Sequence, residues 1–129
     1  MRKRILVVDD DLLTSKVVAQ ILTRLGGYET RVENSAERGL SSALEFRPDL
    51  VVMDYRMPEM TGDEVLNQLR DHPTLQSIPA ILLSGDYNLN SIDQDPMTLL
   101  VRKPVTGDSL VQTAKVLLGE NAGAASSAV

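Results

Sequence analysis

The sequence of 129 residues contains no cysteine and no tryptophan, and only 3% of its residues are aromatic. Without cysteine the chain forms neither disulfides nor thiolate metal sites, which fits a reducing compartment. No apolar run approaches the roughly 20 residues that a membrane-spanning helix needs. The acidic residues Asp9–Asp11 also interrupt the first apolar stretch too early for a signal peptide. We therefore expect a cytoplasmic protein with no membrane partner.

Positive charge is in the minority. Lys and Arg number 13 against 18 Asp and Glu, which gives a net charge of -5 at pH 7. Because nucleic-acid binding depends on cationic contacts to phosphates, this balance argues against a nucleic-acid partner. The hydrophobic content of 43% and charged content of 24% are those of a globular protein. We expect one domain over residues 1–119, then a disordered tail over residues 120–129, which are small, polar and without periodicity.

Short apolar runs alternate along the chain with amphipathic stretches. The runs predict strands at Ile5–Val8, Tyr28–Val32, Leu50–Met53, Ala80–Leu83 and Thr98–Val101. Helical periodicity predicts helices over Leu12–Leu25, from Asn34 to about Phe46, from Thr61 to about Asp71, and from Thr106 to about Leu118. Strands that alternate with helices form a parallel sheet covered on both faces. The predicted fold class is therefore α/β, with a doubly wound five-stranded parallel sheet.

Capping residues mark the predicted helix starts. Asn34 with Glu37, and Thr61 with Glu64, have the spacing of a capping box, and Thr106 is predicted to cap the last helix. In the first helix the apolar residues form a stripe at helical spacing, made of Leu13, Val17, Val18, Ile21, Leu22 and Leu25. Between residues 85 and 97 apolar side chains are few, and Asn, Asp and Pro interrupt them. We expect the fourth helix, in this segment, to be short, irregular or absent.

Four predicted strands end in residues that carry chemistry. Asp9 and Asp10 follow the first strand, Asp54 the third, Ser84 the fourth and Lys103 the fifth. Ligands of open parallel α/β sheets bind beyond the carboxyl ends of the strands. The three acids converge only if the first and third strands are neighbours, as in the flavodoxin-like order 2-1-3-4-5.

Acidic residues in this arrangement suit a magnesium ion. Mg²⁺ keeps several waters and takes one or two carboxylates together with phosphate oxygens. Asp10 and Asp54 are suited as direct ligands and Asp9 as a ligand through water, while the backbone carbonyl of Arg56 completes the shell. Three clustered acids repel one another, which raises the pKa of at least one of them until a cation removes the penalty. The sequence predicts Mg²⁺ as the cofactor.

The same residues suit phosphoryl transfer. Beside a cation, Asp54 is placed to attack phosphorus as a carboxylate nucleophile and to form an acyl phosphate. Lys103 would neutralise one phosphoryl oxygen, and Ser84 would hydrogen-bond another. Each residue alone has a structural interpretation, since acids often cap loops and a lysine before proline is often part of a turn. Their joint occurrence at four strand ends favours the functional interpretation.

The chain resembles the receiver domain of two-component response regulators over about Arg2 to Leu118. The motifs that carry the resemblance are Ile5–Asp10, Asp54 with Met57–Pro58 and Gly62, Leu83–Gly85, and Lys103–Pro104. The resemblance implies that Asp54 is the phosphoacceptor, Asp9 and Asp10 the acidic metal pair, Ser84 the switch hydroxyl and Lys103 the lysine of the family. It also implies a phosphohistidine donor on a sensor histidine kinase or histidine phosphotransfer protein, and a downstream protein target. Such a domain phosphorylates and dephosphorylates itself, and we do not class it as an enzyme.

Two departures from the family pattern bear on mechanism. Leu100 stands where many receivers have a Tyr or Phe that turns inward, so aromatic switching is not available. Val105 replaces the frequent aromatic residue after Lys-Pro. Arg56 and Asp86 lie two positions after the acceptor and the switch hydroxyl, and we predict that they flank the path to the phosphoryl group. A pair between them would slow autodephosphorylation, whereas two independent solvated side chains would not.

Other functions remain open at this stage. One is a pseudo-receiver that interacts with partners without phosphorylation. Another is a phosphohydrolase of the haloacid dehalogenase type, suggested by Asp9–Asp11 and by Gly85–Asp86. That family requires Thr or Val at the position of Leu13, and its lysine precedes the later acidic motif, whereas Lys103 follows Asp86. It also leaves Asp54 without a role. A stand-alone protein and a module of a longer chain fit the sequence equally.

Overall fold

The computed structural model describes residues 2–85 and 96–120. Within these ranges five parallel strands form one sheet in the order β2-β1-β3-β4-β5. The strands are β1 (Arg4–Val8), β2 (Glu29–Glu33), β3 (Leu50–Asp54), β4 (Ala80–Ser84) and β5 (Thr98–Arg102). The order and the parallel pairing confirm the predicted flavodoxin-like sheet.

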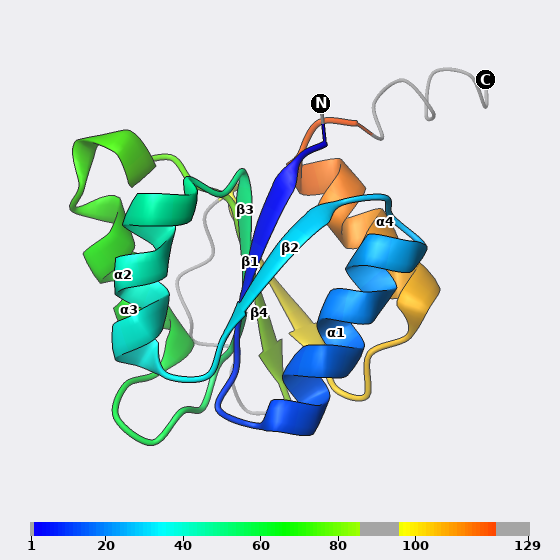
Figure 1. Cartoon of the computed structure of the whole chain (residues 1–129), viewed down its shortest axis with the longest axis horizontal. Coiled ribbons are helices and arrows are strands. Elements are labelled where there is room, and N and C mark those ends of the chain that lie inside the picture. The colour runs from blue at the N-terminus through cyan, green and yellow to red at the C-terminus, as the bar shows by residue number, and fades with distance from the viewer. Residues whose placement is uncertain (1, 86–95, 121–129) are drawn as a thin grey trace.

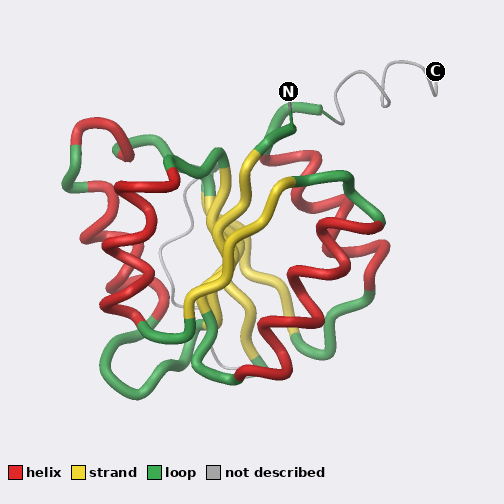
Figure 2. Tube along the Cα trace, viewed as in Figure 1, coloured by secondary structure: helices red, strands yellow, loops and turns green. Residues whose placement is uncertain are grey.

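Helices cover both faces of this sheet. Helices α1 (Leu12–Arg24) and α4 (Gly107–Leu117) lie against one face, and α2 (Ala36–Phe46) and α3 (Gly62–Arg70) lie against the other (Figure 1). A short 3-10 helix, Pro73–Leu75, follows α3. Figure 2 shows the twisted strands as the middle layer, with the loops that follow them gathered at the lower end of the view. The fold therefore brings the carboxyl ends of the strands to one edge.

Side chains of the central strands alternate between two apolar cores. In β1, Leu6 and Val8 lie in the core beneath α2 and α3, whereas Ile5 and Val7 lie in the core beneath α1 and α4. All residues of β3 and β4 are buried. Burial on both faces is the reason that these strands appear in the sequence as continuous apolar runs. The two cores fix the strand ends relative to one another.

The helix starts agree with the predicted caps at two of three positions. The capping box of α3 is confirmed, because the backbone N–H of Thr61 donates to Glu64 Oε1 at 3.0 Å. Thr106 caps α4 by accepting from the N–H of Ser109. The predicted cap at Asn34 is wrong. Ser35 is the N-cap of α2 and accepts from the N–H of Arg38 at 3.1 Å, since the Asn34 side chain bonds elsewhere.

The sheet covers only part of the apolar stripe of α1. Leu13, Val17 and Leu25 are 71%, 47% and 60% exposed. The face of α1 that packs on the sheet is centred instead on Val18 and Leu22. Residues four apart share one side of a helix, so the three exposed side chains continue along the helix as an apolar row that the sheet does not cover.

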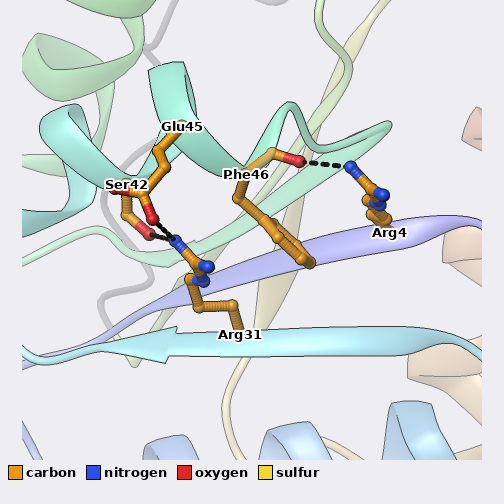
Figure 3. A network of polar contacts seen from close by, with 5 residues as sticks. All are labelled: Arg4, Arg31, Ser42, Glu45 and Phe46. Carbon is orange, nitrogen blue, oxygen red and sulfur yellow. Dashed lines mark hydrogen bonds and ion pairs between the residues drawn. The ribbon is translucent and has the colours of Figure 1, made fainter.

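Polar and aromatic contacts fasten α2 to the strands beneath it (Figure 3). Arg31 of β2 donates to Ser42 Oγ at 3.3 Å and pairs with Glu45 at 3.2 Å, and its guanidinium lies 4.9 Å from the Phe46 ring centre. Arg4 of β1 lies 5.5 Å from the same ring and donates to the Phe46 carbonyl at 2.9 Å. Cations over an aromatic ring are attracted by its negative face. These contacts hold α2 against β1 and β2.

Two predictions concern segments that extend beyond the described residues. The segment expected to hold a short fourth helix includes residues 86–95, and the expected tail includes residues 121–129; both lie outside the described residues. Glu120, at the start of that tail, accepts a hydrogen bond of 2.7 Å from the hydroxyl of Tyr28. Across residues 2–85 and 96–120, no helix has the length and apolar character needed to cross a membrane.

Candidate functional site

Three carboxylates meet at the carboxyl ends of two neighbouring strands. Val8 of β1 lies opposite Met53 of β3, so Asp9 and Asp54 emerge side by side. One carboxylate oxygen from each of Asp9, Asp10 and Asp54 lies within 4.8 Å of the others. The third consecutive acid, Asp11, instead caps α1 and accepts from the N–H of Thr14. The strand order therefore brings together the three acids predicted as metal ligands.

Asp9 is buried and incompletely satisfied. Its side chain is 2% exposed, and its Oδ1 accepts from the N–H of Asp11 at 2.9 Å. Its Oδ2 is, in the described part of the chain, the one buried side-chain nitrogen or oxygen with no hydrogen-bond partner. Burial raises the pKa of Asp9 to about 6, and the negative charges of Asp54 and Asp10 add to this effect against the opposing Asp11 N–H and Lys103 charge. A buried acceptor among carboxylates fits a hard divalent cation.

Asp54 pairs with the lysine that follows β5. Lys103 Nζ lies 2.9 Å from Asp54 Oδ1, and Asp54 is 9% exposed. The lysine backbone is held in place because its N–H donates to the carbonyl of Ser84 at 2.8 Å. A cis peptide bond joins Lys103 to Pro104. The ammonium group of Lys103 is thus positioned at Asp54, the carboxylate predicted to accept the phosphoryl group.

A cavity of about 450 Å³ opens at Asp54. It is lined by Asp54, Arg56, Ser84, Gly85 and Lys103. Ser84 is buried, whereas Arg56 is exposed. The predicted acceptor, switch hydroxyl and lysine therefore share one cavity, which has room for a phosphoryl group.

The remaining predicted site residues lie apart from this cavity or outside the described residues. Leu100 is partly buried against the core beneath α2 and α3 and does not line the cavity. Asp86, predicted to pair with Arg56, lies outside the described residues. Arg56 does line the cavity, and its guanidinium lies 5.9 Å from the ring centre of Tyr55.

The loop after β3 is closed against the acceptor strand at Gly62. The N–H of Gly62 donates to the carbonyl of Tyr55 at 2.6 Å. A Cβ at this position would lie 2.9 Å from the carbonyl oxygen of Asp54 and 3.0 Å from Leu82 Cδ2. Because real Cβ atoms do not approach a backbone oxygen so closely, only glycine allows this close approach of the loop to Asp54.

Sequence reasoning missed one polar contact of the site. Asn34 Nδ2 donates to the carbonyl of Asp9 at 2.8 Å and to Ser15 Oγ at 3.0 Å. In the sequence, Asn34 stands beside Ser35, and both residue types cap helices. No local signal distinguishes a cap from a contact with another strand.

An apolar pocket of about 510 Å³ adjoins the site and was not predicted. It lies between α1 and the loop before α4, and Leu13, Val17, Pro104 and Val105 contribute to its lining. Lys103 lines both this pocket and the cavity at Asp54. The exposed apolar row of α1 is therefore continuous with the candidate site.

The fold and the site together define a doubly wound α/β domain with an acidic cluster and a lysine at the carboxyl edge of its sheet. The family model for the response regulator receiver domain matches residues 5–115, and the chain belongs to this family of two-component signalling proteins. The resemblance noted in the sequence is thereby confirmed. The haloacid dehalogenase alternative has no support from this match.

Individual relatives agree with this assignment. The chain is similar to the polar-differentiation response regulator DivK of Brucella anthropi, with 34% identity over 126 residues, 93% of this chain and 99% of DivK. Among solved structures, the receiver domain of the hybrid histidine kinase CckA is 29% identical, with a TM-score of 0.75, and the match covers 89% of this chain and 98% of that one.

A more distant structure shares the fold. The receiver domain of the sensor histidine kinase PA1611 of Pseudomonas aeruginosa PAO1 is 23% identical, with a TM-score of 0.81 and coverage of 92% of this chain and 99% of that one. That structure has a magnesium ion coordinated in its active site cleft. At this identity the likeness concerns the fold alone.

Proposed function

We propose that the chain is a phosphoacceptor that takes a phosphoryl group onto Asp54 in a Mg²⁺-dependent reaction. The donor is a phosphohistidine of a sensor histidine kinase or histidine phosphotransfer protein, and the product switches or relays a signal. The observation that carries the proposal is the meeting of Asp54 with two further acids and with Lys103, 2.9 Å away, at one cavity.

The metal site is proposed on the chemistry of the acidic cluster. Asp10 and Asp54 would bind the ion directly, Asp9 would bind it through water, and the backbone carbonyl of Arg56 would complete the shell. The bound ion neutralises the clustered carboxylates and screens the negative charge of the incoming phosphoryl group. The buried, unpartnered Oδ2 of Asp9 supports this site, because a buried acceptor without a donor is costly to the fold unless something satisfies it.

The transfer step uses the side chains around the cavity. A carboxylate oxygen of Asp54 attacks phosphorus as the N–P bond of the donor phosphohistidine breaks, and the bond electrons return to the imidazole nitrogen. Before transfer, the ammonium group of Lys103 pairs with Asp54. After transfer, it pairs with a phosphoryl oxygen. Ser84 lines the same cavity and hydrogen-bonds another phosphoryl oxygen. Water later hydrolyses the acyl phosphate and restores the carboxylate.

The added charge is the proposed switch. A phosphoryl group on Asp54 carries about -1.5 to -2 at pH 7 and has strong acceptor oxygens. It draws Ser84 and Lys103, which stand at the ends of β4 and β5, and so biases the loops after these strands between two conformations. Leu100 of β5 replaces the aromatic side chain that is common in receivers, and we propose that the switch works without ring rotation.

The apolar pocket beside the site supports a protein as the donor. Lys103 joins the pocket to the cavity, so a partner seated on the pocket has direct access to Asp54. The exposed Leu13 and Val17 offer such a partner apolar surface. Exposed contiguous apolar surface is typical of interaction sites.

Intact-mass measurement after incubation with Mg²⁺ and a small phosphodonor tests the proposal. Wild type is expected to gain one phosphoryl group, and Asp54→Asn none. Asp108→Asn, in the exposed first turn of α4, is the matched control and is expected to behave as wild type. No gain in wild type contradicts the proposal and favours the pseudo-receiver alternative. A gain that persists in Asp54→Asn contradicts the assignment of Asp54 as acceptor, and a gain that is unchanged by removal of the metal with EDTA contradicts the requirement for Mg²⁺.

A further inference from the structure

The side chain of Asn34 joins three segments beside the acidic cluster. Asn34 follows β2, and its Nδ2 donates to the carbonyl of Asp9 at the end of β1 and to the hydroxyl of Ser15 in α1. A backbone carbonyl only accepts hydrogen bonds, so the amide nitrogen must be the atom that faces Asp9. Asn34 is half-buried and Ser15 is buried, which keeps water from replacing these bonds freely.

These contacts fix the backbone of Asp9 from both sides. The N–H of Asp9 donates to the carbonyl of Glu33 at 3.0 Å, and its carbonyl accepts from Asn34. Its Oδ1 accepts from the N–H of Asp11. Of the polar atoms of Asp9, only Oδ2 is left without a partner. The residue is therefore held so that its carboxylate has one oxygen unused, beside Asp10 and Asp54.

The hydroxyl of Ser15 is itself oriented. It donates to the carbonyl of Leu12 at 2.9 Å, and therefore receives the Asn34 amide with a lone pair. The same amide thus ties the first turn of α1 to the end of β1. The loop between them carries Asp10 and Asp11.

We propose that Asn34 is a positioning residue for the Mg²⁺ site, acting through the backbone carbonyl of Asp9. The proposal rests on the proposed function, in which Asp9 is part of that site. Groups that orient metal ligands set metal affinity, and their removal typically weakens binding about 10- to 100-fold. Because Asn34 holds the backbone of a ligand and not its carboxylate, we expect an effect at the lower end of that range.

Mg²⁺ titration of the metal-free protein, followed by amide NMR shifts or calorimetry, tests the proposal. Asn34→Ala is expected to raise the Kd for Mg²⁺ about tenfold. Ser15→Ala is the matched control, because it removes a bond from the same network but leaves the bond between Asn34 and Asp9. Its Kd is expected to stay within about twofold of wild type.

The outcomes separate this proposal from the proposed function. An unchanged Kd in Asn34→Ala, or an equal loss in both variants, overturns the positioning role, since the second result indicates a general loosening of the loop. If Asn34→Ala does not fold, Asn34→Ser provides the same test, because serine is polar but too short to reach both partners. Asp9→Asn distinguishes a failure of the proposed metal site from a failure of the positioning role alone. If it binds Mg²⁺ as wild type does, the proposed metal site fails, and the role of Asn34 fails with it.

Discussion

Replacing Asp9 by asparagine is expected to stabilise the metal-free protein at neutral and higher pH. The carboxylate is buried, has an unpartnered Oδ2, and titrates with a pKa of about 6 against an ordinary value of 3.8. At about 1.4 kcal/mol per pKa unit, this difference corresponds to about 3 kcal/mol of folding free energy. Asparagine removes the charge and keeps an oxygen that accepts from the N–H of Asp11.

The sign of the pH dependence follows from the raised pKa. Below pH 3.8 the carboxyl group is protonated in both the folded and unfolded states and carries no penalty. Between pH 3.8 and about 6 the unfolded chain ionises while the folded metal-free protein keeps its proton, so stability falls over this range and levels off above it. The amide of the substituted side chain does not titrate. The advantage of Asp9→Asn is therefore expected to grow from near zero at pH 4 to about 2–3 kcal/mol at pH 8.

Urea unfolding followed by circular dichroism, in EDTA between pH 4 and pH 8, measures this difference directly. Other groups titrate in both proteins, so their contributions cancel when the two curves are subtracted. Mg²⁺ at about 100 times its Kd should add about 2.7 kcal/mol to wild type, and much less to Asp9→Asn, which reduces or reverses the order of stability. A difference that is zero, or that does not change with pH, would refute the reasoning.

Three other substitutions have expected outcomes. Lys103→Met should raise Mg²⁺ affinity about fivefold, because the lysine that competes with the metal for Asp54 is lost. It should also slow phosphorylation at least about tenfold. Weaker Mg²⁺ binding by this variant in a titration would contradict the competition. Gly62→Ala should lower the free energy of unfolding by about 1–3 kcal/mol through overpacking, and wild-type stability in urea would count against the close approach. Leu13→Asp should slow phosphotransfer from a protein donor about tenfold without changing the rate with a small phosphodonor. Val116, which is exposed on α4 outside the apolar pocket, provides the control. An equal loss in Val116→Asp would contradict a docking role for Leu13.

Much of the site could be predicted because the order of strands in the sheet determines which strand ends lie close together. A parallel sheet places every strand's carboxyl end at one edge, and β1 and β3 are neighbours in the flavodoxin-like order. Knowing that Asp9 and Asp54 each follow a strand was therefore enough to place them together. Buried strands also have a strong apolar signal, so β1, β3 and β4 were located within one residue of their observed bounds.

The parts that were not predicted depend on contacts between distant segments. Asn34 and Ser35 are equally good caps by residue type, and the choice between them is made by a carbonyl of β1 that no local pattern shows. The apolar pattern of α1 is wider than the face that the sheet covers, and it does not show that Leu13 and Val17 line a surface pocket. Periodicity identifies an apolar side of a helix but not what covers it.

The chemical identity of the phosphorylated residue is the most direct test of the account. Borohydride reduces an acyl phosphate to an alcohol, so an aspartyl phosphate becomes homoserine, which peptide mass mapping locates. After phosphorylation in Mg²⁺ and reduction, the account predicts homoserine at position 54 and unmodified Asp9 and Asp10. Homoserine at either of those two positions, or a phosphoryl group that resists borohydride, would contradict it.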